Sequence, residues 1–214
     1  MSPDDLAEVK FPESGAAVSF RLLQDAVVPR PVYLASTVSE TAVNNVAPYS
    51  YISPAATTPT SFVLSVLRRD DGSEKDTLIN LRASGELVIN AVTEAIVQAA
   101  NACAENLPSH RSEFELAGLT PAFFCSRAPH VGQSPLRFEC KVESEIPFGG
   151  DGPGAASLVI VSVTRAYVAK AMYRGKGQLD IAALRLIGRS SVDQYLVADG
   201  QFTIARPNTG EAIV

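Results

Sequence analysis

The distribution of hydrophobic and polar residues along the chain predicts mostly β-strands. Val, Ile, Leu and aromatic residues gather in short segments that are bounded by Pro, Gly, Ser and Asn, which is typical of strands. We expect strands at residues 31–39, 43–52, 62–67, 86–92, 136–146 and 157–168, and a last short strand at residues 202–205. Pro48 cannot donate a hydrogen bond to a neighbouring strand, so the segment 43–52 is expected to be bent and to lie at a sheet edge or bulge.

Apolar residues at helical spacing predict a few helices between these strands. The segment 75–84 carries Leu78 and Leu81 one turn apart, follows a start signal at Ser73 and Asp76, and is followed by Gly85 as a C-terminal cap. Further helices are expected at residues 94–104 and 112–117 and in part of residues 180–195.

The remaining segments indicate turns and loops. Residues 20–23 are predicted to form a short strand or a turn, and Pro54 and Pro59 are predicted to bracket a loop. The glycine-rich segment 149–154 lies between two predicted strands, which therefore read as an antiparallel hairpin.

Strands outnumber helices in this prediction and do not alternate with them regularly. That order argues against a doubly wound parallel sheet and favours an antiparallel barrel with a few appended helices. We expect one domain over residues 1–214, with residues 1–20 and 206–214 as peripheral tails.

Composition and charge exclude several classes of partner. The chain has 214 residues and a net charge of −5, without a basic stripe, which argues against nucleic acid as the main partner. The longest apolar stretch, residues 155–163, is too short to span a bilayer, and the N-terminus lacks the layout of a signal peptide. The three cysteines are an odd number without a CxxC pair, which indicates reduced thiols and a cytoplasmic protein without a membrane partner.

The start of the predicted helix at residues 75–84 is a candidate anion site. A helix N-terminus presents unpaired N–H groups and partial positive charge, and Lys75, Thr77 and Arg68 add a cation, a hydroxyl and a guanidinium. The alternative is a surface helix capped by its own polar side chains, and spacing alone favours that alternative.

The preceding segment 44–53 combines Asn, Ser and two tyrosines with Pro48. Its polar groups can hydrogen-bond the rim of a flat ring system, and its tyrosines supply apolar surface. The alternative is a strand with ordinary packing tyrosines. Later in the chain, Gly188 and Arg189 either approach an anion or form a turn after a helix.

The sequence lacks the motifs of several other kinds of functional site. The two histidines, His110 and His130, have no metal-ligand spacing, so no metal site is expected. The chain contains no G-x-S-x-G, no Walker loop and no G-x-G-x-x-G, so neither a nucleophile elbow nor a Rossmann domain is expected.

In this order the segments resemble the flavin reductase-like family with the FMN-binding split barrel, specifically its flavoredoxin-like branch. The motifs that carry the resemblance are RPVYLAST, NVAPYSYIS, FVLSV, KDTLINLRASGELVINAV, SEFELAGLTP, SPLRFECKV and IGRSSVDQY, and they cover most of residues 30–195. The family commonly has G-R-L-G-G where this chain has Gly188, Arg189, Ser190 and Ser191, which puts the role of that segment in question.

The resemblance implies a mainly β fold, a six-stranded antiparallel split β-barrel with Greek-key character and a few peripheral helices. It implies a homodimer with FMN at the subunit boundary. The residues that it places along the ring and ribityl chain are Asn45, Ala47, Pro48, Tyr49, Ser50 and Tyr51; those that it places at the phosphate are Arg68, Lys75, Asp76 and Thr77; Arg189 comes from the late segment.

The function that this resemblance implies is that of an FMN-binding oxidoreductase. Electrons would pass from NADH or NADPH, or from another donor, through FMN to a small-molecule acceptor or a protein redox partner, with no catalytic side chain required. The alternative is a non-catalytic FMN-binding electron carrier, and a third possibility is an interaction module that has lost its flavin.

Overall fold

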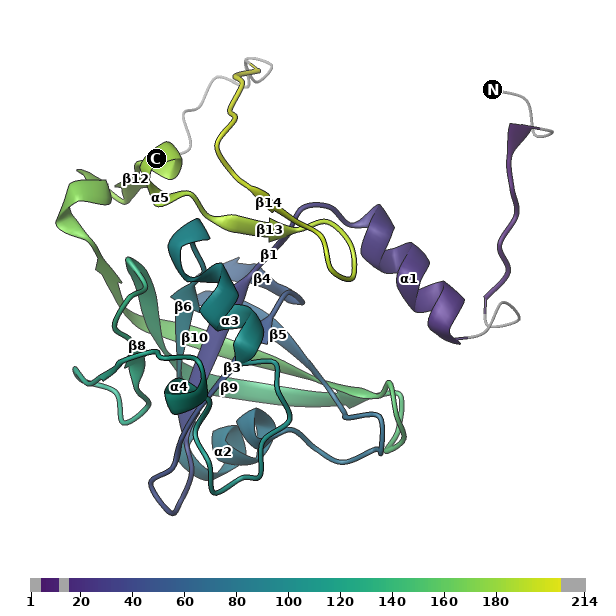
Figure 1. Cartoon of the computed structure of the whole chain (residues 1–214), viewed down its shortest axis with the longest axis horizontal. Helices are drawn as coiled ribbons and strands as arrows, with labels where there is room; N and C mark the ends of the chain where they lie inside the picture. The colour runs from purple at the N-terminus through teal and green to yellow at the C-terminus, as the bar shows by residue number, and fades with distance from the viewer. Residues whose placement is uncertain (1–4, 12–15, 205–214) are drawn as a thin grey trace.

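A large antiparallel sheet forms the centre of the molecule (Figure 1). The computed structural model describes residues 5–11 and 16–204. The sheet has the order β3-β2-β6-β9-β10-β5-β4. Its strands are β2 (Tyr33–Val38), β3 (Asn44–Tyr49), β4 (Ile52–Thr57), β5 (Thr60–Leu67), β6 (Glu86–Ala91), β9 (Leu136–Phe148) and β10 (Ala156–Val168). The predicted mainly β fold is confirmed, and the sheet has one strand more than expected.

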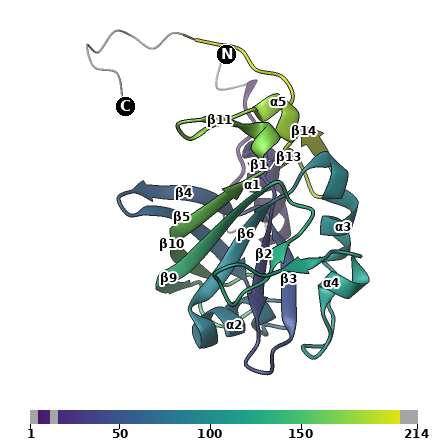
Figure 2. The same ribbon diagram turned by 90° about the vertical axis from the view of Figure 1, so that its left-hand side faces the viewer.

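The sheet curls so that its two edge strands come close at one end. β3 and β4 lie at opposite edges, yet only Ser50 and Tyr51 join them in the chain. So short a link brings the end of β3 next to the start of β4, although no hydrogen bonds pair these two edges. The strands therefore curve around the core as a barrel that stays open between its edges, and Figure 2 shows them fanning from β4 to β3. Pro48 lies in the edge strand β3, as its missing donor predicts.

Apolar side chains fill the barrel, and a second cluster packs outside it. Leu64, Leu87 and Ile89 have no exposed surface and belong to the inner cluster. The outer cluster joins Leu34 and Val46 to Phe114 and thereby holds helices α3 and α4 against the sheet. Since buried apolar area is the main favourable term in folding, these clusters fix the strand register.

The helices are short, and α1 extends away from the barrel (Figure 1). They are α1 (Ala16–Ala26), α2 (Asp76–Ser84), α3 (Val97–Ala102) after the 3₁₀ turn η2 (Glu94–Ile96), α4 (Glu113–Leu116) and α5 (Ile181–Leu184), with a further 3₁₀ turn η3 at Lys170–Met172. The predicted helices at residues 75–84, 94–104 and 112–117 are confirmed within their limits. Gly85 ends α2 with a φ of 69° and donates to the Leu81 carbonyl, which also confirms the predicted cap.

Short strands complete the fold. They are β1 (Arg30–Pro31), β13 (Ile187–Arg189) and β14 (Tyr195–Val197) in one small sheet, β7 (Pro121–Ala122) with β8 (His130–Val131), and β11 (Tyr173–Gly175) with β12 (Gln178–Leu179). Within the described residues, no helix combines the length and the apolarity needed to cross a bilayer.

Two of the secondary-structure predictions for the N-terminal half of the chain are wrong. Residues 20–23 belong to helix α1, whose apolar residues lie on two faces and so give no single helical stripe. The loop expected between Pro54 and Pro59 is mostly strand β4, which tolerates Pro54 because it is an edge strand with a bulge after that residue.

The C-terminal predictions are partly wrong. Of residues 180–195, only α5 is helical, and Arg185 ends it with a φ of 45°. Gly188 lies in strand β13, where it pairs with Pro31. Residues 202–204 form no strand, and Ala205 lies outside the described residues. Of the tails expected at residues 1–20 and 206–214, the second lies outside the described residues and the first runs into α1.

Candidate functional site

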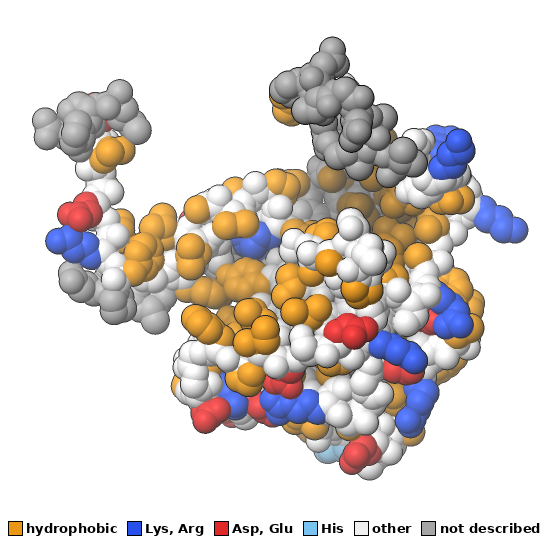
Figure 3. Space-filling model, turned by 180° about the vertical axis from the view of Figure 1, so that it is seen from behind, with side chains coloured by type: hydrophobic (Ala, Val, Ile, Leu, Met, Phe, Trp, Pro, Cys, Tyr) orange, Lys and Arg blue, Asp and Glu red, His pale blue; other side chains and the backbone are white. Residues whose placement is uncertain are grey.

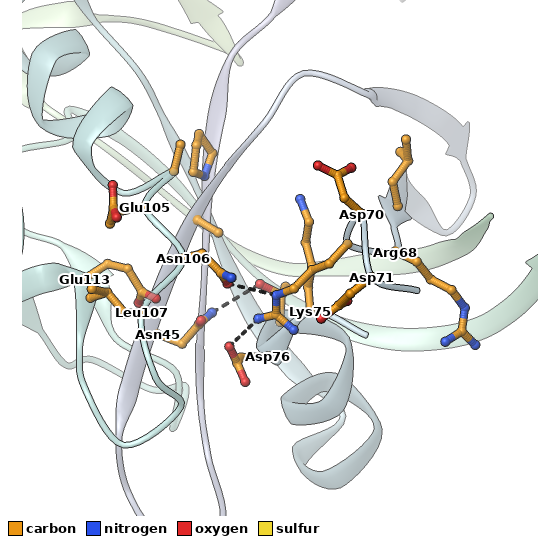
Figure 4. Close-up of a pocket in the computed structure, with 16 residues that line it drawn as sticks. Asn45, Arg68, Asp70, Asp71, Lys75, Asp76, Glu105, Asn106, Leu107 and Glu113 are labelled. Carbon is orange, nitrogen blue, oxygen red and sulfur yellow. Dashed lines mark hydrogen bonds and ion pairs between the residues drawn. The ribbon is translucent and has the colours of Figure 1, made fainter. Parts of the chain in front are cut away.

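A cavity of about 550 Å³ opens between the start of α2, the edge strand β3 and the connection from α3 to α4 (Figure 4). Its size falls within the range of about 300–1,000 Å³ that is usual for small-molecule sites. The predicted site residues that line it are Asn45, Ala47, Pro48, Arg68, Lys75, Asp76 and Thr77. The two segments singled out in the sequence therefore face one cavity.

The N-terminus of α2 faces this cavity without a side-chain cap. Lys75 is the residue before the first helical turn, and no side chain accepts a hydrogen bond from the helix start, so the start signal predicted at Ser73 is wrong. The unpaired N–H groups and the partial positive charge of the helix are therefore open to an anion.

Lys75 adds a full positive charge at the same place. Its Nζ lies 5.5 Å from the centre of the Tyr49 ring, and within residues 5–11 and 16–204 no carboxylate comes within ion-pair distance of it. Burial, and next the neighbouring Arg69, lower the pKa of Lys75. A bound anion would oppose both effects, because a nearby negative charge favours the charged form of the amine.

Arg69 is a site residue that the sequence analysis did not select. Its guanidinium donates to Asp76 Oδ2 at 2.7 Å and to Asn106 Oδ1 at 3.0 Å, and it also donates to the Glu74 carbonyl. It therefore ties the start of α2 to the α3–α4 connection across the cavity.

Arg68, which the sequence analysis did select, is turned outward (Figure 4). It donates to the Gly72 carbonyl at 3.0 Å, to Glu74 Oε1 at 3.2 Å and to Asp151 Oδ1 at 2.9 Å. Its charge is therefore already balanced. The two arginines are adjacent at the end of a strand, so their side chains point in opposite directions. The sequence alone does not show which of them faces the cavity.

Asn45 and Thr77 form part of a buried polar floor. The Asn45 amide donates to Thr37 Oγ1 at 3.0 Å and to Thr77 Oγ1 at 3.2 Å, and Asn80 donates to the same Thr37 oxygen at 3.0 Å. These bonds join β2, β3 and α2, so the floor holds the start of α2 at a fixed distance from the edge strand.

Ala47 and Pro48 provide an apolar wall. The Val46 N–H points away from β2, because it donates to Glu113 Oε2 at 3.1 Å. Donors alternate in direction along an antiparallel strand, so the Ala47 N–H is turned towards β2, and Pro48 has no N–H. A flat apolar surface can therefore lie against these two residues without leaving a buried donor unpaired.

Glu113 lies at the far side of the same cavity and is almost fully buried. Burial is the main cause that raises its pKa, and the Val46 N–H bond opposes that shift. Burial of the carboxyl group therefore disfavours its charged form.

Tyr49, Ser50 and Arg189 line a smaller cavity of about 90 Å³ that shares Pro48 and Ala104 with the first. Tyr49 is buried, and its burial raises its pKa to about 12.

The Arg189 guanidinium lies 5.5 Å from the Tyr195 ring centre and donates to the Val192 carbonyl at 2.9 Å. Arg189 therefore lies beside the site, and some of its guanidinium N–H groups are already bonded to the backbone.

Tyr51 does not face either cavity. The chain bends at Ser50 and Tyr51 between β3 and β4, and the Tyr51 ring meets Phe20 of α1 at 6.0 Å between centres. It lines an apolar groove on the flank of the barrel instead. The structure thus brings together the predicted residues of β3 and α2 and separates Tyr51 from them.

Further residues that the sequence did not indicate line the cavity. They come from the end of β5, the loop before α2, the α3–α4 connection and the start of α4. They are Leu67, Arg69, Asp70, Asp71, Ala104, Glu105, Asn106, Leu107 and Glu113. The connection reaches the cavity through the packing of Phe114 and Ala100 in the outer cluster, a long-range contact that no local pattern encodes.

The comparisons with known proteins point to one family. Residues 25–181 match the model of the flavin reductase like domain. An uncharacterized protein of Halalkalibacterium halodurans is 36% identical over 214 residues, with 99% of this chain and 98% of the relative covered.

Two solved structures illustrate the likeness in three dimensions. The nitrilotriacetate monooxygenase component B of Bacillus cereus is 36% identical, with a TM-score of 0.88 and coverage of 93% of this chain and 98% of that one. Flavoredoxin of Desulfovibrio vulgaris (Miyazaki F) is 21% identical, with a TM-score of 0.70 and coverage of 86% and 94%, which shows a shared fold. The family predicted from the motifs is confirmed.

Proposed function

Because the chain belongs to the flavin reductase-like domain family, we propose that it is an FMN-dependent oxidoreductase that takes electrons from NADH or NADPH. The family membership supports a flavin-related redox function. The choice of FMN, the nicotinamide donor and the residues at the site are the parts that we propose from the geometry below.

The observation that carries the proposal is an unbalanced cation at an uncapped helix start. Lys75 has no carboxylate partner in the described chain, and the α2 N–H groups beside it have no side-chain acceptor. A terminal phosphate monoester supplies the negative charge and the acceptor oxygens that both lack. We assign the phosphate of FMN to this place, with Arg69 at its side.

The acidic residues around the cavity do not oppose this assignment. Asp76 is paired with Arg69, and Glu113 accepts a backbone N–H and has a raised pKa. Asp70, Asp71 and Glu105 are exposed at the rim, where water screens them.

The apolar wall of Ala47 and Pro48 suits the flavin ring. FMN, when bound, supplies a ring that accepts a hydride and passes electrons on. The protein holds that ring against the wall, and the buried polar floor at Asn45 and Thr77 sets the distance from the wall to the phosphate end. Tyr49, buried below Lys75, supports the link between the two ends.

The nicotinamide donor has no dedicated domain, because the chain lacks a Rossmann fingerprint. We propose that it enters the same open cavity transiently and lies against the exposed face of the ring. No side chain need transfer a proton at the ring, so the role of this chain is binding and orientation.

The acceptor is a small redox molecule or a second protein. The Bacillus cereus relative is named as a component of a monooxygenase, which supports a protein partner that uses the electrons. All three cysteines are free thiols, which supports our proposal that the protein functions in the reducing environment of the cytoplasm.

A second candidate is a non-catalytic FMN electron carrier, which the fold shared with flavoredoxin supports. Anaerobic addition of NADH or NADPH to the FMN-loaded protein separates the two. Our proposal predicts rapid loss of the visible flavin absorption with at least one donor. Persistence of the oxidised spectrum with both donors rejects the reductase and leaves the carrier.

A further inference from the structure

The hairpin of β13 and β14 carries polar side chains next to helix α3. Arg189 of β13 pairs with Tyr195 of β14, and the turn between them contains Asp193. The hairpin lies beside α3 in two perpendicular views (Figures 1 and 2), and the Tyr195 hydroxyl donates to Asn101 Oδ1 of α3 at 3.4 Å. The hairpin and α3 therefore form two walls of one hollow.

This hollow, which we call the hairpin cavity, has a volume of about 500 Å³. Val97, Asn101 and Tyr195 line both the hairpin cavity and the small cavity of about 90 Å³. Pro48 and Ala104 line both the small cavity and the candidate flavin cavity. From Ala104 back to Val97 the chain rises on the order of 10 Å, at about 1.5 Å per helical residue. Three adjoining cavities therefore follow α3 from the apolar wall at Pro48 to the hairpin.

The hairpin cavity offers a flat ring and two side-chain amides. The Tyr195 ring is 37% exposed, and Ile187 and Val97 supply apolar surface in the same cavity. Gln98 and Asn101 add amide groups, whose N–H donors have no acceptor among the described residues. A purine base stacks on an aromatic ring and forms hydrogen bonds through its nitrogen atoms. The cavity is therefore suited to an adenine base.

Arg189 lies between the two ends of this row of cavities. It lines the small cavity, and its guanidinium is 5.5 Å from the Tyr195 ring centre. Its Nε and Nη2 both donate to the Val192 carbonyl, whereas its Nη1 has no acceptor in the part of the chain that the structure describes. The planar guanidinium suits phosphate oxygens. A diphosphate that runs along α3 would therefore meet an available donor.

The carboxylates of the hairpin cavity are unequal. Glu94 is paired with Arg185 at 2.5 Å, whereas within residues 5–11 and 16–204 no cation lies at ion-pair distance from Asp193. No described lysine or arginine lines this cavity. A free carboxylate accepts hydrogen bonds from hydroxyl groups and repels a phosphate. The cavity therefore favours a ribose that carries no extra phosphate.

A second hollow beside the small cavity is less suited to a nucleotide. It lies between α1 and the barrel, has a volume of about 510 Å³, and meets the small cavity at Ser50. Hydrophobic side chains continue there from α1 onto the body of the molecule (Figure 3), and Phe20, Leu23 and Leu158 are among its lining residues. A polar nucleotide would lose its hydration against this surface with few hydrogen bonds in return.

We propose that the hairpin cavity holds the adenosine half of the nicotinamide donor and selects NADH over NADPH. The adenine stacks on Tyr195, the diphosphate passes Arg189, and the nicotinamide reaches the flavin cavity. Asp193 accepts hydrogen bonds from the adenosine ribose and repels the 2′-phosphate of NADPH. The identity of the donor rests on the proposed function, whereas the adenosine site rests on the residues of the hairpin and α3.

The first test measures binding without redox chemistry. ADP-ribose carries the adenosine and the diphosphate of NADH but no nicotinamide, so its binding does not require flavin reduction. Saturation-transfer NMR should detect its adenine protons on the wild type, and its 2′-phosphorylated form should bind at least about tenfold more weakly. Tyr195→Ala should weaken ADP-ribose binding by about tenfold through the lost stacking, and Tyr173→Ala, at an exposed tyrosine of another hairpin, should leave it unchanged. Circular dichroism checks that both variants are folded. No binding of ADP-ribose, equal binding of the two ligands, or unchanged binding to Tyr195→Ala overturns the proposal.

The second test compares the two donors in steady-state flavin reduction. The wild type should have a KM for NADPH at least about tenfold above that for NADH, and Asp193→Arg should reverse that order by attracting the 2′-phosphate. Glu143→Arg, which makes the same change at an exposed carboxylate of β9, should keep the wild-type ratio of the two KM values. A ratio near one in the wild type, or an unchanged ratio in Asp193→Arg, contradicts the assignment. If neither donor reduces the flavin, the proposed reductase is rejected, and the ADP-ribose titration alone decides the adenosine site.

Discussion

Replacing Lys75 by methionine should weaken the binding of FMN and leave the binding of riboflavin unchanged. Methionine keeps the length of the side chain but removes its charge. Riboflavin has the same ring and ribityl chain but no phosphate. The pair of ligands therefore isolates the contact between Lys75 and the phosphate.

The magnitude follows from the surroundings of Lys75. The amine is partly buried and has no carboxylate partner in the described part of the chain, so a phosphate would be its first strong acceptor. A charge-assisted hydrogen bond of this kind contributes about 1.5–3 kcal/mol, which corresponds to a rise in Kd of roughly 10- to 150-fold. Arg68→Met is the matched control, and we expect less than about a threefold change, because Arg68 is already paired with Glu74 and Asp151.

Quenching of flavin fluorescence on titration with protein measures both affinities. Raising the salt concentration should weaken FMN binding to the wild type more than to Lys75→Met, because the lost contact is ionic. Equal losses of affinity for riboflavin and for FMN would show that the substitution disturbs the cavity as a whole. Unchanged affinity for FMN would remove the phosphate from this place.

Three further predictions concern the frame of the site. Gly188→Ala should lower the free energy of unfolding by about 1–3 kcal/mol in a urea titration, because the new Cβ would lie 2.7 Å from Pro29 Cβ; an unchanged midpoint refutes the close packing of β13. Leu64→Ala should cost about 2–5 kcal/mol in the same assay, since Leu64 has no exposed surface, and a loss under 1 kcal/mol would mean that the barrel core is loosely packed. Burial lowers the pKa of His130, which faces Glu139 at 3.0 Å, so the unfolded chain binds the proton first as pH falls; stability should drop from pH 7 towards pH 5.5, and His130→Gln should flatten that slope.

The strands of the barrel could be predicted because their sequences carry the information locally. The segments around Leu64 and Ile89 are short, β-branched and bounded by turn residues. Helix α1 could not be predicted in the same way. Its apolar residues lie on two faces, and its end depends on Arg30, which acts from outside the helix.

The candidate site could be predicted only in part. Lys75 and Pro48 were found because a helix start and a proline in a strand have direct physical consequences. Arg69 was missed because its role depends on which of two adjacent arginines points inward. Asn106 and Glu113 were missed because they reach the cavity through packing between elements that are distant in sequence.

A crystal structure of the protein grown with FMN tests the central claim most directly. We predict that the phosphate lies within hydrogen-bond distance of Lys75 Nζ and the first N–H groups of α2, and that the ring lies against Ala47 and Pro48. Bound FMN with its phosphate remote from Lys75, or its ring outside the cavity between β3 and α2, would contradict the account.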